Sequence, residues 1–113
     1  MTIEDMERFG ADTKVGVGRC MGNKDFYLRL VKMMPKDQNF AILYDSIEKG
    51  DLDAAFEAAH ALKGALGNLS ITALYEPMVE LTELLRARTP MDYSELVAAI
   101  KAKHMELEKL CNS

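Results

Sequence analysis

The sequence predicts an all-α protein, arranged as an antiparallel four-helix bundle with short additional helices at its N-terminus. Apolar residues recur at the three- and four-residue spacing of an amphipathic helix along almost the whole chain, and no segment alternates as a half-buried strand does. Four of these periodic segments are long, and the stretches between them are short. Long amphipathic helices joined by short loops pack as antiparallel neighbours, which gives the bundle.

Two short helices are expected at the N-terminus, covering one end or side of the bundle. The first ends at Gly10, and its apolar side consists of Ile3, Met6 and Phe9. The second runs through GVGRCMG, and its apolar side consists of Val15, Val17 and Met21. Glycine is a common residue just past the end of a helix, which favours the first boundary.

Pro35 separates the next two helices. Asn23 is a suitable N-cap for the first of them, because its side-chain oxygen can accept a bond from a free N–H group of the first turn. The apolar stripe of this helix is Phe26, Leu30, Val31 and Met34. The second helix covers residues 36–49 and ends at Gly50, with the stripe Phe40, Leu43, Tyr44 and Ile47.

Asp51 is expected to cap a helix that runs to about Leu69. Its core face follows from an advance of about 100° per residue and consists of Leu52, Ala55, Ala59, Leu62, Leu66 and Leu69.

Two further helices complete the bundle. The first reaches about Arg88 with the stripe Leu74, Met78, Leu81 and Leu85, and Pro77 inside it predicts a bend or a first turn displaced toward Glu76. A Thr-Pro pair at 89–90 then breaks the pattern, and Asp92 is a suitable N-cap for the last helix. The stripe of this last helix is Tyr93, Leu96, Val97, Ile100, Leu107 and Leu110.

Length and a composition with 49% hydrophobic residues indicate one soluble domain over residues 1–113. We expect a monomer, because one bundle of this size can bury its own apolar stripes. The net charge of -4 and the lack of a Lys or Arg run argue against nucleic acid as a partner. No stretch resembles a membrane span or a secretory signal, so we expect a cytoplasmic location without membrane attachment. Cys20 and Cys111 form no CxxC pair and are expected to be free thiols, with no metal site.

One histidine points away from the leucines of its helix. On the helix that Asp51 caps, a second side, with His60 near its middle, carries Asp53, Phe56, Glu57, His60, Lys63, Gly64 and Gly67. Two glycines within a helix lower its stability by about 1 kcal/mol each relative to alanine. Their presence therefore indicates a role outside local helix stability. His104, by contrast, lies beside the Ile100 and Leu107 stripe and is expected to be structural.

The chemistry available to an exposed His60 is nucleophilic. A neutral imidazole keeps one ring nitrogen with a free lone pair, and Lys63, one turn along, can offset charge on a group that the ring carries. Gly64 and Gly67 would let the backbone and active site of a second protein come close. Phe56 would offer that protein an apolar contact or form the edge of the core, and the sequence leaves both interpretations open.

These residues, in the segment HALKGALGNLS, resemble the signature of histidine phosphotransfer (HPt) domains, the helical bundles that carry phosphoryl groups in two-component phosphorelays. The AAFEAAH segment before it, the helix after it and the segment RCMGNKDFYLRLVKMM extend the resemblance over nearly the whole chain. One departure is Ser70, where the family usually has glycine. A serine there can cap a helix, so we expect a modest change in that turn.

The resemblance implies that His60 takes a phosphoryl group from a receiver-domain aspartate and passes it to another, with attachment at Nε2. It implies that Lys63 stabilises the charged group and that Phe56, Glu57, Gly64 and Gly67 form the docking surface. The partners implied are receiver domains of response regulators or hybrid sensor kinases, which would supply Mg²⁺. The chain lacks the GxxxxGK[ST] phosphate-binding loop, so we expect a phosphoryl carrier with no cofactor of its own, not an ATP-dependent enzyme.

Two alternatives remain open at this stage. The chain could be the phosphorylated substrate domain of a larger histidine kinase, like that of a chemotaxis kinase, in which case ATP bound on another domain would be the donor. It could also be an adaptor that binds receivers without being phosphorylated, although the presence of both His60 and Lys63 argues against that.

Overall fold

The computed structural model describes residues 1–113, and all of its regular structure is helical. Three helices, α1 (Ile3–Phe9), α2 (Thr13–Arg19) and α3 (Lys24–Met33), come first. A 3₁₀ turn, η1 (Met34–Lys36), leads into four longer helices: α4 (Gln38–Lys49), α5 (Leu52–Asn68), α6 (Thr72–Arg86) and α7 (Ser94–Cys111). None of these helices is long and apolar enough to cross a membrane.

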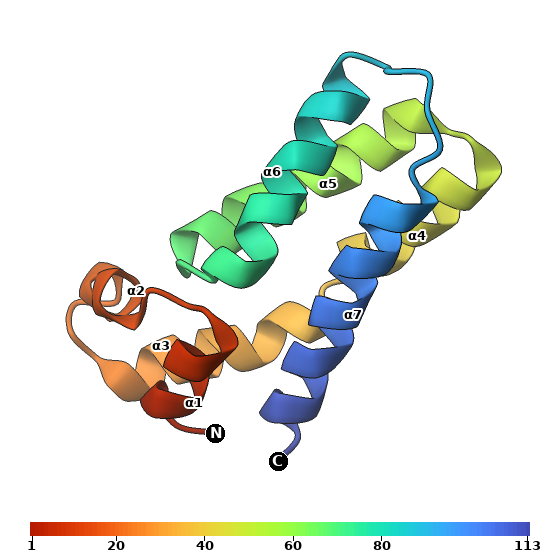
Figure 1. Cartoon of the computed structure of the whole chain (residues 1–113). Coiled ribbons are helices and arrows are strands. Elements are labelled where there is room, and N and C mark those ends of the chain that lie inside the picture. The colour runs from red at the N-terminus through yellow and green to blue at the C-terminus, as the bar shows by residue number, and fades with distance from the viewer.

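Helices α4 to α7 run up and down alternately, and α5 lies between α4 and α6 (Figure 1). Helices α1 to α3 gather at one end of the molecule, near the C-terminal end of α7. The all-α, four-helix prediction with short N-terminal helices is confirmed. The molecule is elongated, with extents of 42 × 24 × 20 Å.

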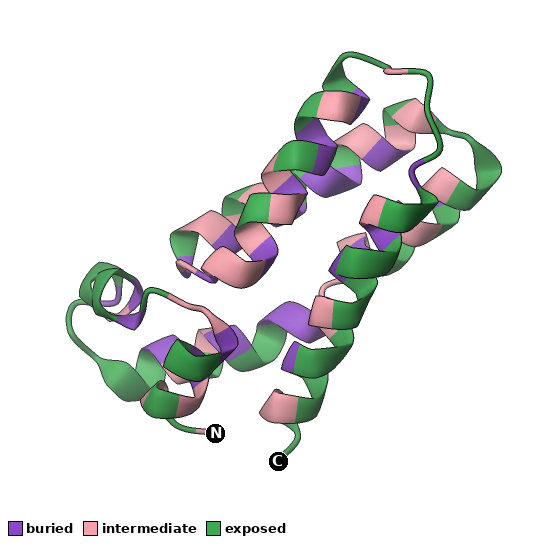
Figure 2. Ribbon diagram, in the orientation of Figure 1, coloured by how far each residue is buried: buried purple, intermediate pink, exposed green.

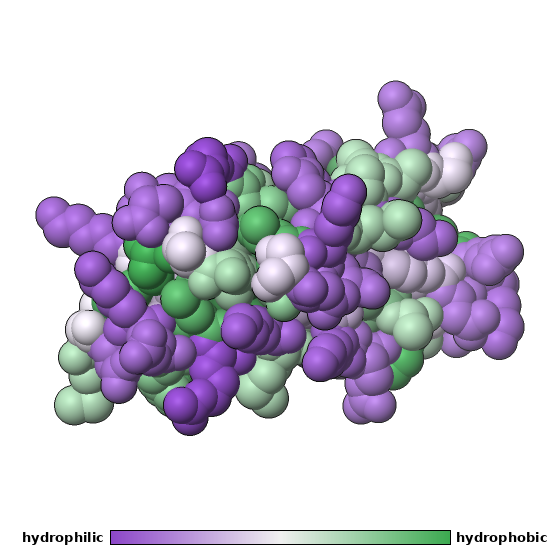
Figure 3. Space-filling model, turned by 90° about the horizontal axis from the view of Figure 1, so that it is seen from below, coloured by the Kyte–Doolittle hydropathy of each residue, from purple (hydrophilic) through white to green (hydrophobic).

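The buried faces of the long helices turn toward one another and form one core (Figure 2). Seen from the end where α1 to α3 lie, apolar side chains reach the surface only in small areas between hydrophilic ones (Figure 3). The side chains that α5 adds to the core are Ala55, Ala58, Ala59, Leu62 and Leu66. All of these were predicted to face inward except Ala58, which widens the core face toward a neighbouring helix.

Short loops hold α5 in place at both ends. Gly50 ends α4 in the left-handed conformation at φ 74°, and the Asp51 side chain accepts a hydrogen bond of 3.1 Å from the Ala54 N–H. At the other end the Ile71 N–H donates to the Leu66 carbonyl at 3.0 Å, which turns the chain directly into α6. The predicted caps Asp51 and Gly50 are therefore confirmed.

Of the apolar side predicted for the second helix, only Val17 packs against the core. Helix α2 does form, but Val15 and Met21 are 43% and 96% exposed, and the buried residues are Thr13 and Gly16. Gly16 lies so close to α3 and to the end of α5 that an added Cβ would come within 2.4 Å of the Tyr27 ring. The helix thus approaches the bundle through its backbone, which a pattern of apolar side chains cannot predict.

Helix α3 also turns a different residue inward. Phe26, expected in its stripe, is 43% exposed, while Tyr27 is fully buried and donates a hydrogen bond of 2.8 Å to the Leu69 carbonyl. Burial raises the pKa of the Tyr27 hydroxyl to about 12, so it stays a donor at neutral pH. This bond ties α3 to the turn between α5 and α6.

The last two helices differ from expectation at their N-termini. Helix α6 begins at Thr72 and contains Pro77, so the first turn is not displaced toward Glu76. Helix α7 has Tyr93 at its N-cap position, and the predicted cap Asp92 accepts a bond of 2.9 Å from the Ser94 N–H. The Ser94 hydroxyl and this backbone bond lower the pKa of the Asp92 carboxyl.

Replacing Gly16 by alanine tests the close approach of α2. Because its Cβ would overlap Tyr27 and the Leu69 carbonyl, Gly16→Ala is expected to lower the free energy of unfolding by about 2 kcal/mol. The matched control is Gly18→Ala, since no atom lies within 4 Å of a Cβ there. The control should gain up to about 1 kcal/mol from helix propensity. Equal stability of the two variants in urea unfolding would contradict the packing.

Candidate functional site

The exposed face of α5 carries the residues that the sequence placed on it, except that Gly67 lies against Tyr75 of α6. His60, Glu57 and Gly64 are exposed, and Phe56 and Lys63 are half-buried. One helical face therefore brings these side chains together without help from a loop. The predicted exposure of His60 is confirmed.

The His60 ring makes no hydrogen bond within the chain. It stacks on the Phe56 ring, one turn earlier, with the centroids 5.7 Å apart and the ring planes inclined by 19°. This is an offset stack, an arrangement that aromatic rings prefer. Both imidazole nitrogens are thus open to a group that arrives from solvent.

Two arginines at the end of α6 complete this part of the surface. The guanidinium carbons of Arg86 and Arg88 lie 4.9 and 5.4 Å from the centre of the Phe56 ring, within the range of cation–π attraction. Arg88 also donates from Nε to the Asp53 carboxylate at 2.8 Å. The sequence analysis missed both arginines, although the antiparallel order of α5 and α6 places the end of one helix beside the beginning of the other.

The two glycines of α5 have different surroundings. A Cβ on Gly64 would meet no atom within 4 Å, so nothing inside the molecule requires glycine there. A Cβ on Gly67 would come within 2.9 Å of the Tyr75 ring, so this glycine lets α5 and α6 approach each other closely. The cost of Gly64 in helix stability therefore has no internal explanation, whereas that of Gly67 has one that sequence reasoning did not find.

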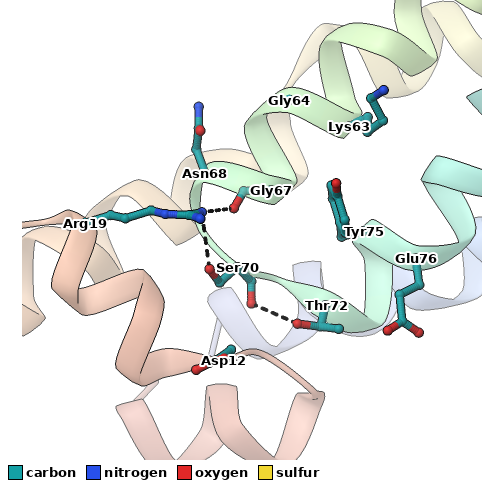
Figure 4. A pocket seen from close by; sticks show the side chains of 10 residues that line it. All are labelled: Asp12, Arg19, Lys63, Gly64, Gly67, Asn68, Ser70, Thr72, Tyr75 and Glu76. Atoms are coloured by element: carbon teal, nitrogen blue, oxygen red, sulfur yellow. Dashed lines mark hydrogen bonds between the residues drawn. The ribbon is translucent and has the colours of Figure 1, made fainter.

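An open groove of about 530 Å³ begins one turn beyond His60 (Figure 4). Lys63 and Gly64 of α5 lie along one side of it, and Tyr75 and Glu76 of α6 lie along the other. Arg19 reaches in from α2. The groove continues the exposed face of α5 across to α6 and includes residues that no single helical face contains.

Arg19 and Ser70 meet at the end of this groove. The Arg19 guanidinium donates to the Gly67 carbonyl and lies 3.5 Å from the Ser70 hydroxyl (Figure 4). Ser70 has a left-handed backbone with φ 53°, and the N-cap of α6 is Ile71, without a side-chain cap. The expected capping role of Ser70 is therefore wrong, and its conformation is one that glycine adopts without strain.

His104 is structural, as predicted. Its ring stacks on Phe40 at 3.8 Å, and its Nε2 lies 2.8 Å from the Pro35 carbonyl. Because a carbonyl only accepts, Nε2–H is the donor, and in the neutral ring Nδ1 accepts from the Tyr44 hydroxyl at 2.9 Å. Burial raises the pKa of that hydroxyl. Both nitrogens of His104 are occupied, in contrast to those of His60.

Metal and redox chemistry would need clustered ligands or reactive cysteines. No group of three or more His, Cys, Asp or Glu side chains converges as a metal site would. Cys20 is buried and Cys111 is half-buried, and both are free thiols, as predicted. Burial raises the pKa of the Cys111 thiol, which keeps it protonated.

Comparison with protein families identifies one match. The family described as Hpt domain matches residues 34–112, from η1 to the end of α7. The match covers the four bundle helices and the whole exposed face of α5, and it begins after α3. No curated protein and no solved structure matched the chain.

The strain at Ser70 can be tested by restoring glycine. Ser70→Gly is expected to raise the free energy of unfolding by about 0.5 kcal/mol, because relief of the left-handed backbone outweighs the entropy gained by the unfolded chain. Ser70→Ala keeps the strained backbone and loses the hydroxyl, so it should not gain stability. A loss of stability in both variants would show that the contact with Arg19 outweighs the strain.

Proposed function

Since the chain belongs to the Hpt domain family, whose members carry phosphoryl groups on histidine in two-component signalling, we propose that His60 is its phosphoryl acceptor. In this proposal His60 takes the group from a receiver-domain aspartate and passes it to the aspartate of another receiver. The observation that carries the proposal is an imidazole that is exposed and free of internal hydrogen bonds, beside a glycine whose missing side chain leaves open space.

The reaction is an exchange of one bond to phosphorus for another. The lone pair of a His60 ring nitrogen attacks phosphorus in line with the aspartyl oxygen, an N–P bond forms, and the P–O bond breaks. The bonding pair leaves with the aspartate, which becomes a carboxylate. Transfer to the second receiver runs the same steps in reverse, so the carrier ends unchanged. We assign the attachment to Nε2, as the family resemblance implies.

The neighbours of His60 have two roles, which are to stabilise the charge of the phosphoryl group and to leave room for the receiver. Lys63, one turn along and half-buried, is positioned to bring its ammonium toward the phosphoryl oxygens that His60 would carry. Gly64 keeps side chains away from the path of the incoming receiver, and Phe56 and Glu57 border that path. The receiver supplies the acidic residues and Mg²⁺ that hold the phosphoryl group before transfer, and this chain needs no cofactor of its own.

Transfer of ³²P from a phosphorylated receiver tests the acceptor directly. The wild-type chain should acquire label that is stable in base and lost in acid, because protonation of the ring makes it a better leaving group. His60→Gln should acquire none, while His104→Gln should still be labelled, since both His104 nitrogens are bonded internally. Equal labelling of His60→Gln would overturn the proposal, and a wild-type chain that binds the receiver without taking label would favour the adaptor.

A second test separates docking from stability. Gly64→Ala should raise the free energy of unfolding by up to about 1 kcal/mol, because the new methyl group meets no atom of the chain. The same methyl group stands in the path of the receiver, so transfer should slow about tenfold or more. Gly18→Ala is the control, with a similar gain in stability and unchanged transfer. A Gly64→Ala chain that is both stabler and fully active would remove the docking role of this glycine.

A further inference from the structure

The His60 ring stacks on Phe56 and has no hydrogen bond to hold its orientation. An exposed histidine without a hydrogen bond samples several side-chain rotamers, and in-line attack requires one of them. The Phe56 ring, one turn earlier on α5 and stacked at 5.7 Å, restricts this choice. The orienting contact in this chain is therefore aromatic, whereas His104 is oriented by two hydrogen bonds.

Phe56 is itself held from the opposite helix. The Arg86 and Arg88 guanidinium groups lie over its ring, at 4.9 and 5.4 Å from the centroid. The half-buried ring also packs against the edge of the core. Phe56 is thus fixed on one side by the core and on another by two cations, so its ring is more rigid than that of an isolated surface phenylalanine.

Several polar partners hold the Arg88 side chain. Its guanidinium forms an ion pair with Asp53 at 2.6 Å and donates to the carbonyls of Leu85 and Arg86 at the end of α6. The Arg88 backbone N–H also donates to the Leu85 carbonyl at 3.0 Å, so backbone and side chain of Arg88 close the helix end together. Asp53, Phe56 and His60 lie on the same exposed face of α5, which makes Arg88 a link from one helix to the other.

We propose that Phe56 is a positioning residue for phosphotransfer, and that Arg88, anchored by Asp53, keeps the Phe56 ring stacked on His60. The inference rests on the proposed role of His60 as acceptor. It assigns Phe56 a role in the transfer step itself, in addition to its place beside the path of the receiver. It also assigns functions to Arg88 and Asp53, which touch neither the phosphoryl group nor the attacking nitrogen.

Steady-state transfer from a phosphorylated receiver distinguishes positioning from docking. Phe56→Leu keeps an apolar side chain but removes the stack, so the maximal rate should fall about threefold to tenfold with little change in KM. Phe56→Tyr keeps the ring and should keep the maximal rate of the wild type. A raised KM with an unchanged maximal rate in Phe56→Leu would assign Phe56 to docking alone and overturn the inference. Phe26→Leu, an exposed phenylalanine on α3, is the matched control.

The chemical shifts of the His60 ring protons, measured by nuclear magnetic resonance, report the stack on Phe56 directly. In the wild type the Phe56 ring current should shift the carbon-bound imidazole protons of His60, and the shift should vanish in Phe56→Leu and persist in Phe56→Tyr. An unchanged His60 spectrum in Phe56→Leu would show that the stack does not form in solution. The His104 signals serve as an internal reference for the fold.

Arg88 provides a test that leaves the core intact. Arg88→Gln and Asp53→Asn should each lower the maximal rate about twofold to threefold, and neither should lower it further in the Phe56→Leu background. Additive effects would mean that Arg88 acts independently of Phe56 and would overturn the link. Loss of labelling in His60→Gln together with normal rates in Phe56→Leu would refute this inference while leaving the acceptor role standing.

Discussion

The packing of α5 between α4 and α6 is the constraint on which the rest of the structure depends. Its alanines and leucines face both neighbours, and their burial removes apolar area from water on two sides of one helix. A helix held this way cannot rotate about its axis without exposing that area. The opposite face is therefore presented to solvent in a fixed orientation, and His60 lies on it.

This arrangement explains why two histidines in one chain have such different surroundings. His104 lies where α7 meets the beginning of α4, and two internal hydrogen bonds occupy its nitrogens. His60 lies on the exposed side of α5, and its nitrogens make no internal hydrogen bond. A ring whose two nitrogens are hydrogen-bonded holds helices together, whereas a ring without such bonds keeps a lone pair available to a group from solvent.

The N-terminal helices contribute to the same region although they precede the residues that match the family. The Tyr27 hydroxyl and the Arg19 guanidinium both reach carbonyls at the end of α5, and the Asp12 N–H donates to the Ser70 carbonyl at 2.8 Å. The turn between α5 and α6 is thus held from three points of the N-terminal segment. Arg19 also lines the groove, so these helices support the exposed face and extend it.

Much of this protein follows from its sequence. The period of the apolar residues determined the helices of the bundle, and the same wheel determined that His60 faces water, because both depend only on the geometry of a helix. The tertiary structure decided what lies across from each side chain. The arginines over Phe56, the close approach of Gly16 to Tyr27 and the bond from Arg19 to Gly67 all arise between residues far apart in the chain. Helical periodicity carries no information about such contacts, because it does not state which helix a face will meet.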